Sequence, residues 1–263
     1  KRLRISRAAF PLTSFVWWCQ SQPSIIITEL SDFKVFFSYL FANMNIFRLA
    51  GDMSHVLSIF ILLLRLIGSK QATGISLKTQ EMFLIVFVTR YLDLFTTFYS
   101  IYNSVMKVLY IAATGYIVYM IRFKEPYKSK YDATQDSFLH WKYGALPCAV
   151  FAIVTQAISY SLDPIELLWT FSIYLEAIAI LPQLIVLQRF REVENLDGHY
   201  IFLLGAYRAL YIVNWVYRSF YEPYYHHNYV VYVAGVVQTL LYADFFYYYV
   251  ISKYYGGKFT LPT

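Results

Sequence analysis

Arg90 and Asp93 stand inside the apolar stretch FVTRYLDLF at 87–95. Charged side chains are costly in lipid and persist there only where they face a protein interior or a wet cavity and have partners. Arginine stays charged and grips carboxylates with a planar, two-pronged guanidinium. The two residues therefore mark a candidate site for a charged ligand, with a pair that only neutralises itself as the structural alternative.

Helical spacing places the other polar residues of the apolar segments on shared faces, because positions three, four, seven or ten apart lie on one side of a helix. The sets are Arg48, Asp52 and His55; Glu166, Trp169 and Glu176; and Arg208, Tyr211, Trp215 and Arg218, with Tyr91 beside Arg90 and Asp244 in the last segment. They predict a polar funnel with four arginines, which suits a ligand bearing several carboxylates. Asp93, Glu166 and Trp169 are suited to a cation.

Each of these residues also has a structural interpretation. Arg48 and Arg218 can extend to lipid head groups. Glu176 and Arg208 can form a buried ion pair that joins two helices. His55 is a natural titrator between neutral and mildly acidic pH, and a neutral, hydrogen-bonded histidine is the alternative. The sequence contains no nucleophile–base pair, metal cluster or phosphate loop, so we expect no catalysis, no metal and no cofactor.

The composition indicates an integral membrane protein. Of 263 residues, 59% are hydrophobic and only 14% are charged, whereas a soluble domain has about 25% charged residues. Two cysteines, Cys19 and Cys148, argue against a disulfide framework. The basic residues are scattered between apolar runs, so no nucleic-acid-binding module is expected.

Seven apolar segments are long enough to approach the roughly 20 residues of a spanning helix. They lie at 46–66, 80–100, 104–122, 144–161, 166–188, 199–219 and 229–251. Basic residues gather on alternate connections, at 70–78, 122–130, 189–191 and 253–258, and the opposite side holds only Lys107 and Arg218 near helix ends. The positive-inside rule then places the end at Met44 in the lumen and the C-terminus in the cytosol.

An internal similarity suggests a repeat. Lys78-Thr79-Gln80 and Leu181-Pro182-Gln183 are each followed by a segment with an interior arginine, Arg90 or Arg208. We therefore expect an all-α membrane protein with two parallel three-helix repeats and a linker helix.

The ends differ from this body. Residues 1–43 combine a basic start with a short apolar run, which resembles a signal or transit peptide; an upstream extension, a fragment or a mistaken start are the alternatives. We assign 44–252 to the seven-helix domain and 253–263 to a cytosolic tail.

From Met44 onward the chain resembles the KDEL receptors, or ER lumen protein-retaining receptors. The similar blocks are MNIFRLAGDMSH, GISLKTQ with TRYLDLFT, LLWTFSIYLEAIAILPQL, YRALYIVNW and VAGVVQTLLYADFF. The resemblance implies a fold like that of PQ-loop (SWEET-like) sugar transporters. It also implies a receptor that binds C-terminal Lys/His-Asp-Glu-Leu signals of escaped ER proteins at the lower pH of the cis-Golgi. COPI vesicles would then return receptor and cargo to the ER.

The same resemblance implies roles for the residues named above. Arg90 and Tyr91 would clamp the terminal carboxylate, Arg48 and Arg218 the acidic side chains, and Asp93, Glu166 and Trp169 the first, cationic residue, with Tyr211 and Trp215 also lining the site. His55 would sense pH, and Glu176, Tyr207 and Arg208 would form a lock. Asp244 would act in transport, and Lys253 would bind the COPI coat.

Two other classes of protein fit seven spans. A PQ-loop sugar transporter is the main alternative, but its pathway is expected to be lined by neutral polar and aromatic groups rather than by four arginines. A G-protein-coupled receptor is the other, although no cysteine pair suited to a loop disulfide is present.

Overall fold

The computed structural model describes residues 45–159, 163–190 and 195–255. Contacts within the chain divide it into a unit of residues 1–43 and 100–102 and a unit of 44–99 and 103–263, and the second unit holds the candidate site. The predicted extension 1–43, Cys19 and residues 256–263 of the predicted tail lie outside the described residues.

The described residues form helices and contain no strand, which confirms the all-α class. The α-helices are α3 (Ile46–Ser69), α4 (Leu77–Arg90), α5 (Ile101–Phe123), α6 (Tyr127–Lys130), α7 (Leu146–Ile158), α8 (Pro164–Ile178), α9 (Leu181–Phe190), α10 (Asn195–Tyr221), α11 (Tyr229–Leu241) and α12 (Ala243–Tyr255). A 3₁₀ turn, η1 (Leu92–Phe95), follows α4, and a π-helical segment, η2 (His140–Ala145), precedes α7.

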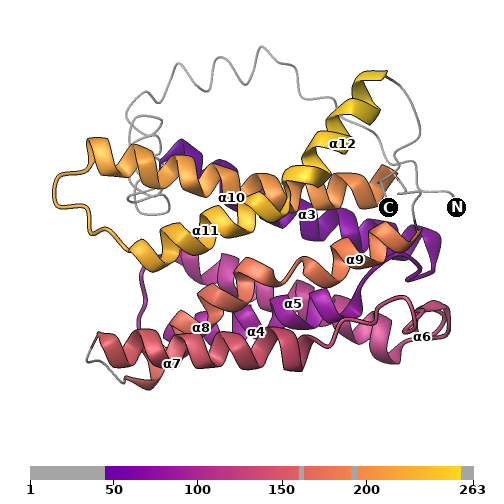
Figure 1. The fold of residues 1–263 in the computed structure, drawn as a ribbon, viewed down its shortest axis with the longest axis horizontal. Coiled ribbons are helices and arrows are strands. Elements are labelled where there is room, and N and C mark those ends of the chain that lie inside the picture. The colour runs from indigo at the N-terminus through magenta and orange to yellow at the C-terminus, as the bar shows by residue number, and fades with distance from the viewer. Residues whose placement is uncertain (1–44, 160–162, 191–194, 256–263) are drawn as a thin grey trace, which may run out of the picture. The chain divides into compact units, whose positions relative to one another are not determined.

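Within the described residues, three helical stretches are long and apolar enough to cross a membrane: α3, α5 and the continuous run 164–190 of α8 and α9. The helices α11 and α12 make a fourth if they are counted together, with a bend of 42° between them (Figure 1). These stretches support a membrane protein. The count of seven spans and the repeat architecture remain predictions.

The helix expected at 80–100 is shorter than predicted. α4 ends at Arg90, and Tyr91 leaves the helical conformation with φ −101° and ψ 24°. The carbonyl of Asp93 then accepts hydrogen bonds from the amides of Thr96 and Thr97, which closes the short turn η1. Arg90 is therefore at the end of a helix rather than in the middle of one.

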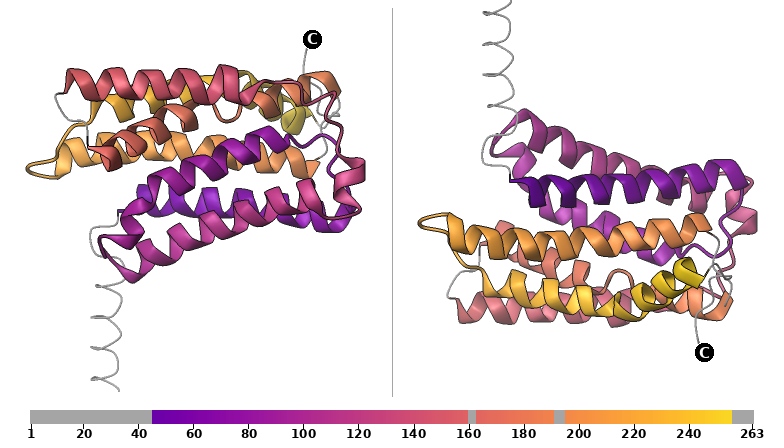
Figure 2. Two further views of the ribbon diagram at one scale, coloured as in Figure 1. Left: turned by 90° about the horizontal axis from the view of Figure 1, so that it is seen from below. Right: turned by 90° about the horizontal axis from the view of Figure 1, so that it is seen from above.

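α3 packs along α10, while α8 contacts α4, α7 and α11 (Figures 1 and 2). Two glycines allow close approach to α10. A Cβ atom on Gly51 of α3 would lie 2.9 Å from the Tyr211 ring. One on Gly205 of α10 would lie 2.5 Å from the Phe246 ring of α12, so neither position has room for a side chain.

The two similar segments at 78–80 and 181–183 meet in space. The Gln183 amide donates to Thr79 Oγ1 at 2.9 Å. The Gln183 side chain accepts from the Ser76 amide at 2.8 Å and donates to the Gly74 carbonyl at 2.8 Å. These bonds tie the start of α9 to the start of α4, which helps to hold α8 against α4.

Candidate functional site

The centre of the site is the carboxylate of Glu176 on α8, which is 2% exposed. Arg90 Nη1, from the end of α4, contacts its Oε2, and Arg208 Nη2, from α10, contacts its Oε1. The Tyr207 hydroxyl also donates to Oε1. Three helices that are distant in the sequence therefore converge on one buried carboxylate, and we call these four residues the Glu176 cluster.

The guanidinium of Arg90 is fixed by the backbone and side chain of α8 as well. Its Nε donates to Ser172 Oγ at 3.1 Å and its Nη2 to the Ser172 carbonyl at 3.0 Å. Because all three of its nitrogens are engaged in this way, Arg90 does not pair with Asp93. The self-neutralising Arg90–Asp93 pair, considered as an alternative from the sequence, is therefore wrong.

The Glu176 cluster carries one more positive than negative charge, since two guanidiniums face one carboxylate. Burying an unbalanced charge is costly, and an added anion lowers that cost. The arrangement therefore favours binding of a ligand carboxylate close to Arg90 or Arg208.

Tyr207 links the Glu176 cluster to His55. Its hydroxyl accepts hydrogen bonds from Gln238 Nε2 of α11 at 3.0 Å and from Arg208 Nη2 at 3.2 Å. Its ring stacks on the His55 ring, with centroids 4.1 Å apart and planes at 10°. His55 is buried and also lies against Phe83, Phe87 and Tyr110. A change of charge on His55 would thus occur next to the Glu176 cluster.

Asp52 and Arg48 lie on the same face of α3. The Tyr211 hydroxyl of α10 donates to Asp52 Oδ1, and Tyr110 donates to the Asp52 carbonyl at 3.1 Å. Arg48 is half-buried and makes no ion pair among the described residues. The Asn45 side chain caps the start of α3 and also donates to Asn214 of α10 at 2.6 Å. Because Arg48 makes no ion pair among the described residues, its guanidinium is available to an anion.

Arg218 lies at the edge of a cavity of about 470 Å³ between the start of α8, the end of α10 and the following loop. Its Nε pairs with Glu222 at 2.7 Å, and its guanidinium lies 4.8 Å from the centroid of the Tyr225 ring. Trp169 and Trp215 line the same cavity. Glu166 is exposed in the first turn of α8. The cavity thus combines aromatic walls with an arginine whose carboxylate partner is half-exposed.

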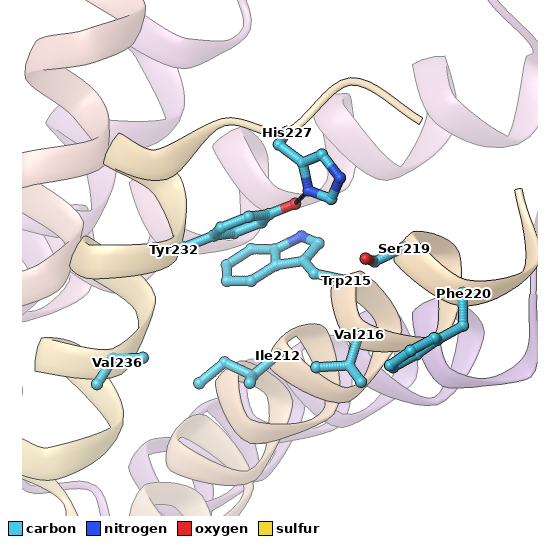
Figure 3. Close-up of a pocket in the computed structure, with 8 residues that line it drawn as sticks. All are labelled: Ile212, Trp215, Val216, Ser219, Phe220, His227, Tyr232 and Val236. Carbon is cyan, nitrogen blue, oxygen red and sulfur yellow. Dashed lines mark hydrogen bonds between the residues drawn. The ribbon is translucent and has the colours of Figure 1, made fainter. Parts of the chain in front are cut away.

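A second, apolar pocket of about 270 Å³ lies between α10 and α11 (Figure 3). Its lining includes Ile212, Val216 and Val236, and His227 Nδ1 lies 3.1 Å from the Tyr232 hydroxyl at one end. The indole of Trp215 lies between this pocket and the 470 Å³ cavity, since it lines both. Among the described residues that line the apolar pocket, none is an acidic residue, a lysine or an arginine.

Asp93 has a partner that the sequence reasoning did not assign. The Lys107 ammonium of α5 lies 2.6 Å from Asp93 Oδ2, and Lys107 is 8% exposed. The sequence alone identifies Lys107 only as a charge near a helix end. The cation position proposed at Asp93 is therefore occupied in part by a lysine of the chain itself.

The two residues predicted to act in transport lie on α12. Asp244 is exposed in the first turn of α12, and the Lys253 ammonium in the last turn lies 5.8 Å from the Tyr249 ring centroid. Lys253 is thus helical rather than part of an irregular tail. Among the described residues, no cluster of three or more histidine, cysteine or acidic residues could hold a metal.

Sequence reasoning also missed Ser172 and Gln238. Ser172 precedes Glu176 by four residues, so helical spacing could have placed both on one face. Gln238 stands alone in the apolar run VVQTLL, and a lone amide in such a run indicates a hydrogen bond within the protein.

The sequence is similar to those of several known proteins. The family model for ER lumen protein retaining receptors matches residues 71–218. ER lumen protein-retaining receptor B of Arabidopsis thaliana is 52% identical over 219 residues, which cover 83% of this chain and all of the relative. The Plasmodium falciparum receptor is 48% identical (83% of this chain, 98% of the relative), and receptor 2 of Gallus gallus is 49% identical (83% and 100%).

Proposed function

This chain belongs to the ER lumen protein-retaining receptor family, and we propose that it captures lumenal proteins through a C-terminal Lys/His-Asp-Glu-Leu signal. The observation that carries the proposal is the Glu176 cluster, in which two buried arginines share one carboxylate. Such a signal ends in a carboxylate and has two acidic side chains, so it supplies the anions that this interior lacks.

Binding proceeds by exchange of carboxylates. The terminal carboxylate of the signal takes the place of Glu176 at Arg90, with the Tyr91 hydroxyl beside it. Glu176 stays bound to Arg208 and Tyr207, which are its other partners. Each guanidinium then faces a carboxylate of its own, and the buried charge becomes balanced.

The two acidic side chains of the signal bind the outer arginines. Arg48 has no competing ion pair among the described residues, and Arg218 exchanges Glu222 for the ligand. Trp169, Trp215 and Tyr211 enclose the extended peptide, and Glu166 with Asp93 attracts its first residue. A half-exposed pair such as Arg218–Glu222 is weak, so its exchange costs little.

Acid favours capture and neutral pH favours release. The reason is that His55 stacks on the Tyr207 ring, and protonated His55 favours the ligand-bound arrangement of the Glu176 cluster through Tyr207. The receptor then binds in the cis-Golgi and releases in the ER, with its C-terminus in the cytosol. Cargo binding shifts the population of conformers toward one in which Asp244 and Lys253 on α12 engage the COPI coat. Such coupling is typically worth about 1–3 kcal/mol.

The test is calorimetric titration of the purified full chain with a peptide ending in His-Asp-Glu-Leu, at mildly acidic and at neutral pH. Arg90→Ala should weaken binding by at least about 30-fold, because the terminal carboxylate of the signal would then be buried without a guanidinium partner. Arg189→Ala is the matched control, since Arg189 is exposed and its hydrogen bonds among the described residues go to the carbonyls of Thr134 and Gln135.

Equal affinity at the two pH values would overturn the pH mechanism, and full binding by Arg90→Ala would overturn the site. A flux assay in proteoliposomes separates the receptor from a PQ-loop sugar transporter. Sugar uptake by the wild-type chain, without peptide binding, would favour the transporter.

A further inference from the structure

Lys107 is a buried lysine on α5 whose ammonium has one carboxylate partner and two aromatic neighbours. It lies 2.6 Å from Asp93 Oδ2, 5.8 Å from the Tyr91 ring centroid and 5.4 Å from the Tyr99 ring centroid. A buried lysine remains charged only with such partners. These contacts therefore hold a positive charge beside the residue assigned to the cation of the signal.

The other oxygen of the same carboxylate is unsatisfied. Asp93 Oδ1 is buried and has no hydrogen-bond partner among the described residues, while Oδ2 is taken by Lys107. A buried acceptor without a donor is costly, and a donor from a bound ligand would remove that cost. Asp93 is thus arranged to receive a second donor while it keeps Lys107.

We propose that Lys107 is a specificity-determining residue, a cation of the receptor itself that shares Asp93 with the first residue of the retention signal. This inference rests on the proposed function. Because the ammonium already balances the carboxylate, the first residue of the signal meets a neutral pair that offers one open acceptor. The receptor therefore accepts a neutral hydrogen-bond donor such as histidine nearly as well as a lysine.

The charge balance predicts how selectivity changes. Removing the ammonium leaves Asp93 as an isolated anion, which attracts a cationic first residue more strongly. Removing the carboxylate leaves Lys107 as an isolated cation, which repels a cationic first residue and attracts an acidic one. Removing both charges returns the position to neutrality.

The experiment compares peptides ending in Lys-Asp-Glu-Leu, Ala-Asp-Glu-Leu and Asp-Asp-Glu-Leu on the full chain. The measured quantity is the ratio of affinities for the lysine and alanine peptides. Lys107→Met should raise this ratio by about ten-fold, and Asp93→Asn should lower it below the wild-type value and improve binding of the aspartate peptide. Asp93→Asn/Lys107→Met should return the ratio close to wild type.

Lys142→Met is the matched control, because Lys142 is also a lysine over a tyrosine ring but is exposed. It should leave every ratio unchanged. An unchanged ratio in Lys107→Met, or an equal loss for all three peptides, would show a purely structural role and overturn the inference.

Two provisions keep the test decisive. If Lys107→Met does not fold, Asp93→Asn/Lys107→Met replaces it, since the double variant leaves no unpaired charge. The aspartate peptide should then lose the gain in affinity that it shows with Asp93→Asn. If the peptide keeps that gain in the double variant, the inference is overturned. Binding of the alanine peptide, lost in Arg90→Ala, reports on the proposed function separately. If no peptide binds the wild type, the proposed function fails first.

Discussion

Two buried charge clusters in this chain differ in their balance. In the first, Arg65 of α3 faces Asp197 of α10, with Nε 3.0 Å from Oδ1. The other guanidinium nitrogens of Arg65 donate to the carbonyls of Gln71 and Thr73, each at 2.7 Å. In the second, Glu176 faces both Arg90 and Arg208.

The difference separates structure from function. The Arg65–Asp197 pair has one carboxylate for its guanidinium, and backbone carbonyls accept from its remaining donors, so it joins α3, α10 and the loop from α3 to α4. The Glu176 cluster is also rich in hydrogen bonds, yet it retains a surplus positive charge. Both sets of charges are buried, but their expected roles differ. The Arg65–Asp197 pair should matter for stability alone, and the Glu176 cluster for stability and binding.

The largest effect on stability should come from Asp197→Asn. This change leaves the buried Arg65 without its carboxylate and should lower the free energy of unfolding by about 3–5 kcal/mol. Thermal unfolding in detergent measures the loss. Peptide affinity of the fraction that remains folded should be unchanged; a specific loss of binding would contradict the division between the two clusters. In Arg65→Met/Asp197→Leu, where neither charge is left alone, most of the stability should return.

Arg208→Met should have a smaller effect on stability and a larger one on binding. Glu176 keeps Arg90 as a partner, so no carboxylate is left alone, but the surplus positive charge that attracts the ligand is gone. We expect roughly 10- to 100-fold weaker peptide binding in calorimetry. The prediction fails if peptide affinity is unchanged, or if this variant is as unstable as Asp197→Asn.

Tyr207→Phe tests the tyrosine hydroxyl of the Glu176 cluster. The ring that stacks on His55 is retained, while the bond to the Glu176 carboxylate and the bonds from Arg208 and Gln238 are lost. A hydrogen bond to a charged group is worth about 1.5–3 kcal/mol, so stability and binding should both fall by about this amount or somewhat more. Thermal unfolding and titration of the same sample check it, and a wild-type affinity would remove Tyr207 from the lock.

The smallest effect should come from Asp132→Ala, in a loop outside both clusters. Hydrogen bonds from the Thr134 hydroxyl and amide hold the pKa of this exposed carboxyl below its usual value. Because the folded-state pKa is lowered, the contribution exists above the usual carboxyl pKa and disappears as pH falls through the folded-state value. At neutral pH the variant should match wild type in peptide affinity, with a melting temperature within measurement error. A clear change would mean that loop charges contribute to the comparison.

Helical spacing was enough to group the residues on each helix but not to choose partners between helices. It placed Arg208, Tyr211 and Trp215 on one side of α10, and all three do face other helices or cavities. It could not show that Arg90 would bind α8 rather than Asp93, because that depends on where α4 ends. The chain leaves the helix at Tyr91, and no glycine or proline in FVTRYLDLF marks this end.

The class and the family were within reach of the sequence, since composition indicates a membrane protein and the conspicuous blocks extend over most of the chain. Lys107 was harder to interpret. A lysine near the end of an apolar helix usually extends toward water, and only the approach of η1 to α5 gives this one a carboxylate. Arg65 was missed for a related reason, because its partner Asp197 is 132 residues away.

The close contact at Gly205 ties α10 to α12. Gly205 is only two residues before Tyr207 on α10, and the Phe246 ring of α12 occupies the space that a Cβ atom would need. A tilt of α10 that follows exchange at the Glu176 cluster would therefore also displace the helix that carries Asp244 and Lys253. A methyl group added at Gly205 would push the two helices apart and should alter this coupling.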